Sequence, residues 1–126
     1  MQALILVGMG GAAGSLLRYW LTLITAQLVG EAFPWGTLAI NVLGSLVIGA
    51  FAALTGSNGD FSGNQSLRLL VMVGICGGFT TFSSFSLQTL TLLRAGQTLQ
   101  AALYAAASVA LCVIATAAGL ALFSRA

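Results

Sequence analysis

Four long apolar stretches, separated by short polar segments, account for almost the whole chain. They cover residues 3–28, 34–54, 67–93 and 99–123. A helix needs about 20 apolar residues to cross a hydrocarbon core of roughly 30 Å, and each stretch reaches that length. The pattern therefore predicts an all-α membrane protein, with residues 1–126 forming a single transmembrane domain of four helices.

The segments between the apolar stretches are typical of turns and exposed loops. Residues 30–32 precede Pro34, a residue that suits the first turn of a helix. Residues 55–66 are rich in Gly, Ser and Asn, and residues 94–97 form a short Gly-containing connection. Because consecutive spans alternate in direction, we expect the two termini on the same side. The first stretch is long and lacks a preceding positive charge, so we interpret it as a retained helix rather than a signal peptide.

Charged side chains are too few for a water-facing surface. They make up 5% of the 126 residues, against about 25% in soluble domains. A net charge of +2 without a basic cluster gives no ground for nucleic-acid binding. The chain has no histidine, and both of its acidic residues fall outside the spans. We therefore expect neither an enzyme active site nor a proton-coupled transporter.

The four basic residues are all arginines, and they are divided between the two ends of the predicted helices. Arg68 and Arg125 fall at one face of the membrane, Arg94 falls at the other, and Arg18 lies deep in the first span or near its end. Arginines near helix ends normally decide which side faces the cytoplasm. The near-even division predicts insertion in both orientations, and hence antiparallel, dual-topology homodimers. Arg18 is either an interfacial anchor beside two aromatic residues or a basic vestibule residue that attracts anions.

Small residues recur at a spacing typical of close helix packing. Gly10 and Gly14 are four residues apart, as are Gly74 and Gly78, and this spacing allows membrane helices to approach each other. The run GMGGAA over residues 8–13 also fits a permissive dinucleotide-binding pattern. We reject that interpretation because the motif requires a preceding strand in a soluble fold.

Two polar residues share one face of the second predicted helix. Thr37 and Asn41 are four residues apart, and an amide in lipid costs free energy unless it finds a partner. Asn41 is therefore either an interhelical contact, worth about 0.6–2 kcal/mol, or a donor that lines a polar path.

The fourth predicted helix carries a polar stripe, because Tyr104, Ser108, Cys112 and Thr116 recur every four residues. Hydroxyl groups in a helix often bond back to their own backbone, and this is the alternative to a lined path.

The centre of the third stretch is the most unusual segment of the chain. The run GGFTTFSSFS, residues 77–86, is poor material for a continuous lipid-facing helix. Irregular backbone at membrane depth is tolerated only where protein buries it or water reaches it. We predict a break here, with freed carbonyls from two chains converging on one cation. Phe82 and Phe85 share a helix face, and their positively polarised ring edges would favour a small anion. The alternative is a polar kink with ordinary aromatic packing.

Three segments together resemble the Fluc/CrcB family of fluoride channels. They are GGAAGSLLRY (residues 10–19), PWGTLAIN (residues 34–41) and GGFTTFSSFS (residues 77–86). The resemblance extends over nearly the whole chain. It implies a multi-pass protein of the bacterial inner membrane, an antiparallel homodimer, two separate fluoride pores and a structural sodium ion at the two-fold axis.

Residue by residue, the resemblance also implies functional positions. The sodium ligands would be the backbone carbonyls of Gly77 and Thr80. Two positions depart from the family pattern: Gln88 stands where a glutamate is common, and Cys112 stands where a hydroxyl is commoner. The remaining matches are the pore residues Asn41, Phe82, Phe85, Tyr104 and Ser108.

The leading hypothesis is passive fluoride export that lowers the cytoplasmic fluoride concentration. An unpaired charge in hydrocarbon costs tens of kcal/mol, so a pore must replace lost water with donors and ring edges. Two alternatives remain. A small multidrug exporter is similar in size, but it needs a membrane carboxylate that residues 3–28 lack. A non-transporting assembly subunit would need only glycine-rich helices. The expected pore set is Thr37, Asn41, Phe82, Ser83, Phe85, Gln88, Tyr104, Ser108 and Cys112.

Overall fold

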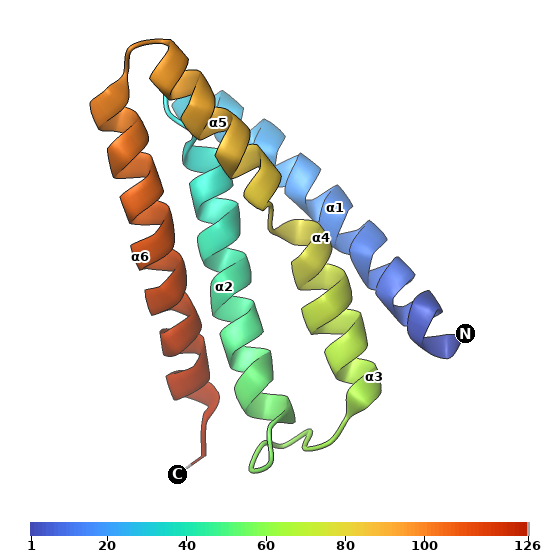
Figure 1. Cartoon of the computed structure of the whole chain (residues 1–126). Helices are drawn as coiled ribbons and strands as arrows, with labels where there is room; N and C mark the ends of the chain where they lie inside the picture. Colours follow the sequence, from blue (N-terminus) through green and yellow to red (C-terminus); the bar gives the residue numbers. More distant parts are fainter. Residues whose placement is uncertain (126) are drawn as a thin grey trace.

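The computed structural model describes residues 1–125, and all the secondary-structure elements in these residues are helices (Figure 1). Four helical stretches are long and apolar enough to cross a membrane: Gln2–Val29, Trp35–Thr55, Gln65–Arg94 and Thr98–Phe123. Their ends differ from the predicted stretches by at most two residues. The chain is therefore an all-helical protein with four candidate membrane spans.

Three of these spans are single helices: α1 (Gln2–Val29), α2 (Trp35–Thr55) and α6 (Thr98–Phe123). Pro34 precedes the first turn of α2 instead of lying within it, with φ −78° and ψ 58°, and its carbonyl accepts from the Leu38 N–H. Between α5 (Phe82–Arg94) and α6, Gly96 has a positive φ of 76°, a conformation that favours glycine. The Gln97 N–H donates there to the Leu92 carbonyl at 2.9 Å, so the connection is a tight turn.

The third span consists of several elements. They are α3 (Gln65–Leu67), the π-helix η1 (Arg68–Cys76), α4 (Gly77–Phe79) and α5 (Phe82–Arg94). Thr80 and Thr81 are extended between α4 and α5, with ψ of 157° and 114°. Both residues lie within residues 77–86. They change the direction of the chain halfway along this span (Figure 1).

Glycines set the distances between the helices. A Cβ added to Gly10 would meet the Leu70 carbonyl, and one added to Gly14 would meet the Ile75 carbonyl. The close packing predicted from glycine spacing is therefore present where α1 crosses η1. The same arrangement joins α2 to α6, where the backbone of Thr116 lies against Gly49. Here the small residues allow backbone to approach backbone.

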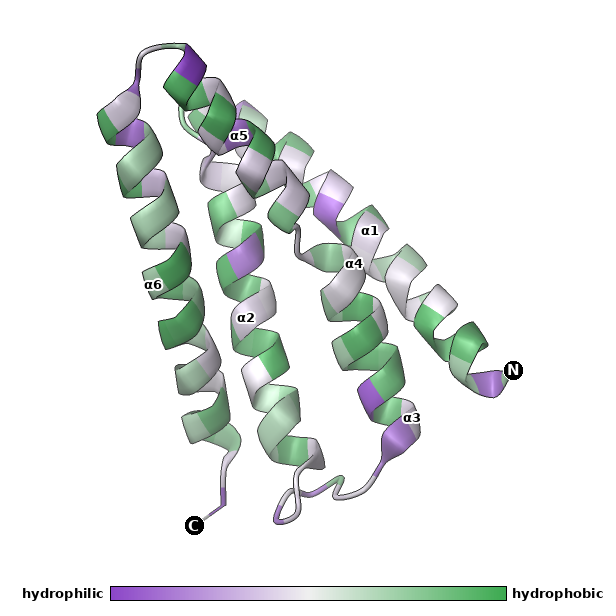
Figure 2. Cartoon of the chain, viewed as in Figure 1, coloured by the Kyte–Doolittle hydropathy of each residue, from purple (hydrophilic) through white to green (hydrophobic). Residues whose placement is uncertain are grey.

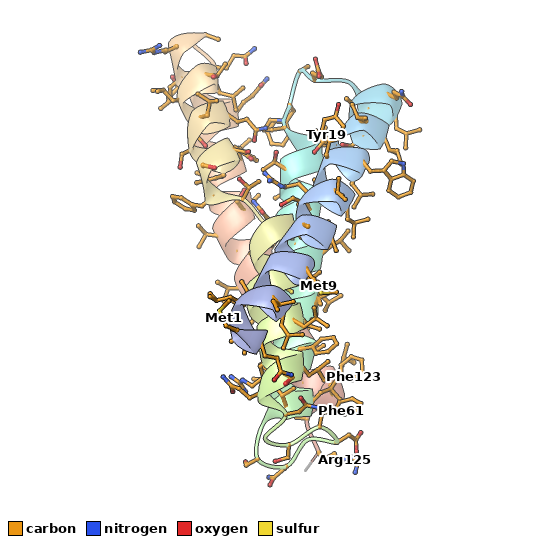
Figure 3. All side chains as sticks on the ribbon, turned by 90° about the vertical axis from the view of Figure 1, so that its right-hand side faces the viewer. Met1, Met9, Tyr19, Phe61, Phe123 and Arg125 are labelled. Atoms are coloured by element: carbon orange, nitrogen blue, oxygen red, sulfur yellow. The ribbon has the colours of Figure 1, made fainter. Side chains whose placement is uncertain are left out.

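Hydrophilic residues lie mostly toward the two ends of the bundle, and the helices between the ends are mainly apolar, with a few hydrophilic positions (Figure 2). Both termini lie toward the end that carries the loop between α2 and α3 (Figure 1). Arg125 pairs with Asp60 of that loop at 2.6 Å, and Figure 3 shows Arg125 and Phe61 at this end, with Tyr19 toward the other. Arg68 donates to the Thr55 hydroxyl at 3.2 Å. The exposed apolar surface between the ends suits contact with lipid.

Candidate functional site

A cavity of about 480 Å³ lies beside the extended residues of the third span. Its walls come from α2, η1, α4, α5 and α6 and from the extended residues Thr80 and Thr81. It brings together seven of the residues selected from the sequence, which lie up to 71 positions apart in the numbering. They are Asn41, Gly77, Thr80, Phe82, Phe85, Ser108 and Cys112.

Asn41 connects α2 to the extended segment through both ends of its amide. Its Nδ2 donates to the Thr81 carbonyl at 3.1 Å, and its Oδ1 accepts from the Thr81 N–H at 2.8 Å. The interhelical contact of Asn41 is therefore observed, and its role in a polar path stays a prediction. The amide is an interhelical contact, and it also lines the cavity with one Nδ2 hydrogen left over.

Thr81 organises the start of α5. Its hydroxyl oxygen accepts from the Ser84 N–H at 3.2 Å, which is an N-cap contact. The same oxygen lies 3.1 Å from Ser84 Oγ and 3.2 Å from Ser83 Oγ. The hydroxyl of Ser83 is thus paired with Thr81, and Ser83 is not among the residues that line the cavity.

Three aromatic rings follow one another from the cavity into the core. The ring centroids of Phe82 and Phe85 are 5.3 Å apart, and those of Phe85 and Tyr104 are 5.2 Å apart. Phe82 is 78% exposed on the protomer, whereas Tyr104 is fully buried. The first ring of the series therefore lies on the open surface of the cavity.

The polar stripe of α6 divides into positions with different surroundings. Ser108 is 8% exposed, and its Oγ is buried without a hydrogen-bond partner among the described residues. Cys112 is half-buried on the same cavity wall. The Thr116 hydroxyl donates back to the Cys112 carbonyl at 3.0 Å. Ser108 thus lies on the cavity wall with its hydroxyl oxygen covered, whereas the Thr116 hydroxyl is bonded to its own helix.

Thr37, Gln88 and Tyr104 form a separate hydrogen-bonded group. The Tyr104 hydroxyl donates to Gln88 Oε1 at 2.8 Å, and Gln88 Nε2 donates to the Thr37 hydroxyl at 2.9 Å. Thr37 and Gln88 line a second cavity of about 400 Å³, together with Thr22, Thr25 and Glu31. The selected pore residues therefore fall into two groups, which Phe85 and Tyr104 connect.

Arg18 lies apart from both cavities. It is half-buried on α1, and its Nε is buried without a hydrogen-bond partner among residues 1–125. It lines neither cavity. In this protomer the anchor and vestibule interpretations of Arg18 both remain.

Sequence reasoning missed two hydroxyl-bearing residues of the first cavity, Ser45 and Thr81. Ser45 comes four residues after Asn41 and continues the face that Thr37 begins. The rule of four-residue spacing, which identified the polar stripe of the fourth predicted helix, would have found Ser45 if it had been extended along the second helix. No local signal distinguishes Thr81 from Thr80, because the contact that sets Thr81 apart comes from Asn41 on another helix.

Comparison with known proteins gives consistent matches over most of the chain. Residues 5–120 match the family model described as CrcB-like protein, Camphor Resistance (CrcB). The Fluoride-specific ion channel FluC of Rhodospirillum rubrum is 57% identical over 108 residues, which are 86% of this chain and 84% of the relative. The protein of the same name from Rhizobium leguminosarum bv. trifolii is 52% identical over 120 residues, 95% of this chain and 94% of the relative.

Proposed function

The chain belongs to the CrcB-like family, and from this premise we propose how its residues perform the activity for which its relatives are named. It is a multi-pass membrane protein and a fluoride channel, and not an enzyme. Fluoride moves down its electrochemical gradient, which exports it from the cytoplasm. Glu31 and Asp60 lie outside the four spans, so the spans supply no carboxylate for coupling to protons.

The buried hydroxyl of Ser108 is the observation that carries this proposal. A buried hydroxyl without a partner costs about 1–3 kcal/mol, and Ser108 Oγ has none within the described chain. The same cavity holds the Phe82 and Phe85 rings and the Asn41 amide. An anion in this cavity would accept from Ser108 and from the remaining Asn41 N–H. It would also contact the positively polarised edges of the rings.

We assign the anion path to both groups of polar residues. The first group faces the larger cavity and includes Ser108 and Cys112. The second is the hydrogen-bonded set of Thr37, Gln88 and Tyr104 beside the smaller cavity. Ser83 does not line the cavity, and we include it in the path because its hydroxyl contacts the hydroxyl of Thr81, which does. None of these residues carries a full charge, which suits conduction, because a pore that binds its ion too tightly cannot release it.

An antiparallel, dual-topology homodimer is the assembly that we propose. Phe82 is 78% exposed beside a cavity that contains polar groups, and a second copy would remove this surface from lipid. Arg68 and Arg125 at one end and Arg94 at the other give little orientation bias. A C-terminal tag that is found on only one face of the membrane would refute dual topology.

A structural sodium ion at the dimer axis completes the proposal. Gly77 and Thr80 line the larger cavity, and Gly77 is exposed on the protomer. Their carbonyls are hard oxygen ligands of the kind that hard cations prefer. In residues 1–125 no three His, Cys, Asp or Glu side chains come together as a metal site. A bound sodium ion would supply the positive charge that holds carbonyls of two protomers together.

Efflux from liposomes tests the proposed function. Purified protein should release fluoride rapidly and chloride far more slowly, without nucleotide. Equal rates for the two anions would refute selectivity. Drug-dependent proton exchange would instead favour a multidrug exporter, and no flux from intact dimers would favour an assembly subunit.

A further inference from the structure

The hydrogen-bond pattern around Thr80 and Thr81 shows which carbonyls lose their helical donors. In an uninterrupted α-helix each carbonyl accepts from the N–H four residues later. The Gly77 carbonyl would therefore accept from Thr81, and the Thr80 carbonyl would accept from Ser84. Neither donor is available to them, because both donate to side-chain oxygens.

The Thr81 N–H is taken by Asn41. Oδ1 of this side chain accepts it at 2.8 Å, while Nδ2 donates to the Thr81 carbonyl at 3.1 Å. A side-chain amide on α2 thus takes the Thr81 N–H. It also donates to the Thr81 carbonyl, which as the N-cap carbonyl accepts the first intrahelical bond of α5 as well. The Gly77 carbonyl is left without its helical donor as a direct consequence.

The Ser84 N–H is taken by Thr81 itself. The hydroxyl oxygen of Thr81 accepts it at 3.2 Å and caps α5. The Thr80 carbonyl therefore also lacks its helical donor. The other polar groups of Thr80 point backward along the chain, since its N–H and its hydroxyl both donate to the Cys76 carbonyl, at 2.9 and 2.8 Å.

The packing of α2 fixes the position of this arrangement. A Cβ added to Gly44 would meet the Thr80 methyl group, so α2 approaches the extended segment three residues beyond Asn41. The backbone of Thr81 is therefore fixed to α2 by two hydrogen bonds and by close contact. The position of the Thr81 backbone is therefore set by residues of α2.

We propose that Asn41 is a positioning residue for the cation site. It occupies the Thr81 N–H and thereby presents the Gly77 carbonyl, while the Thr81 hydroxyl does the same for the Thr80 carbonyl. This inference rests on the proposed sodium site and assigns Asn41 a role beyond the anion path. The cation site and the anion path are then coupled through one amide, because Asn41 lines the larger cavity and also binds the Thr81 backbone.

The test measures sodium binding directly and not only flux. Purified protein is unfolded by heat at increasing sodium concentrations, with N-methylglucamine as the replacement cation. A cation that binds only the folded protein raises its stability as its concentration rises. For Asn41→Ala we expect the apparent sodium affinity to fall about tenfold, the equivalent of one lost hydrogen bond. Asn41→Asp keeps an acceptor for the Thr81 N–H and should stay within about threefold of the parent protein, although its fluoride flux falls.

Two further variants keep the inference falsifiable if Asn41→Ala does not fold. Thr81→Val keeps the side-chain shape and removes the acceptor for the Ser84 N–H, so its sodium affinity should also fall. Ser86→Ala is the matched control, because its hydroxyl donates only to the Phe82 carbonyl of its own helix. We expect the control to bind sodium as the parent protein does.

The outcomes separate this inference from the proposal on which it rests. If Asn41→Ala or Thr81→Val folds and retains the sodium dependence of the parent protein, the positioning role is wrong. If the parent protein itself shows no sodium dependence, the sodium site fails and this inference fails with it. Fluoride selectivity in liposomes would be unaffected by that result.

Discussion

The Tyr104 hydroxyl offers a clean test of the buried hydrogen-bonded group. The side chain is fully buried, and its hydroxyl donates to Gln88 Oε1 at 2.8 Å. Its ring meets the Phe33 ring edge-on, with centroids 5.5 Å apart. The change Tyr104→Phe removes one oxygen atom and leaves this packing in place.

The expected cost follows from the hydrogen bond alone. Interhelical hydrogen bonds in membrane proteins average about 0.6 kcal/mol and reach about 1.7 kcal/mol. Because Gln88 Oε1 is left without this donor in a half-buried site, we expect about 1 kcal/mol for Tyr104→Phe. Gln88→Leu should cost more, since it removes both the acceptor of the Tyr104 hydroxyl and the donor to the Thr37 hydroxyl. When Gln88→Leu is already present, adding Tyr104→Phe should cost almost no further unfolding free energy.

A double-mutant cycle on the free energy of unfolding in mixed micelles measures this coupling. We expect a coupling energy of about 1 kcal/mol between positions 88 and 104. Tyr19→Phe is the matched control, because the Tyr19 side chain is 66% exposed on α1. If the costs of Tyr104→Phe and Gln88→Leu add to within about 0.3 kcal/mol, the assigned hydrogen bond does not contribute.

Three other changes have expected outcomes that separate function from stability. Ser108→Ala should slow fluoride efflux without lowering the unfolding temperature, because the Ser108 Oγ has no partner in the described chain. Thr116→Ala is its control and should leave efflux unchanged. Equal losses of efflux in the two variants would contradict the proposed path. Gly14→Ala should destabilise the protein by more than about 1 kcal/mol, since its Cβ would meet backbone, whereas Gly8→Ala meets open space and should be neutral or stabilising. Arg125→Ala should change the unfolding free energy by less than about 1 kcal/mol, because its pair with Asp60 is exposed.

The sequence was sufficient for the four spans and for the helix crossing at the glycines. Apolar length determines whether a segment can cross a bilayer, and this property is local. Gly10 and Gly14 could be identified for the same reason, because a four-residue spacing places them on one face. The structure shows that the helix they meet is η1, at Leu70 and Ile75.

Contacts between helices could not be predicted in the same way. Spacing identifies the residues that share a face, but it does not show which neighbouring helix that face meets. Asn41 was therefore recognised as a polar residue in need of a partner, and the Thr81 backbone was not foreseen as that partner. Gln88 was noted for its difference from a common glutamate, and its position between Thr37 and Tyr104 required three helices to be placed together.

The reversal potential of a planar bilayer containing the protein tests the central claim most directly. With a tenfold fluoride gradient and equal chloride on both sides, a fluoride-selective passive channel should give zero current at about 60 mV, the fluoride equilibrium potential. The potential should not change when a pH gradient is added. A reversal near zero, or one that follows chloride or protons, would contradict the account.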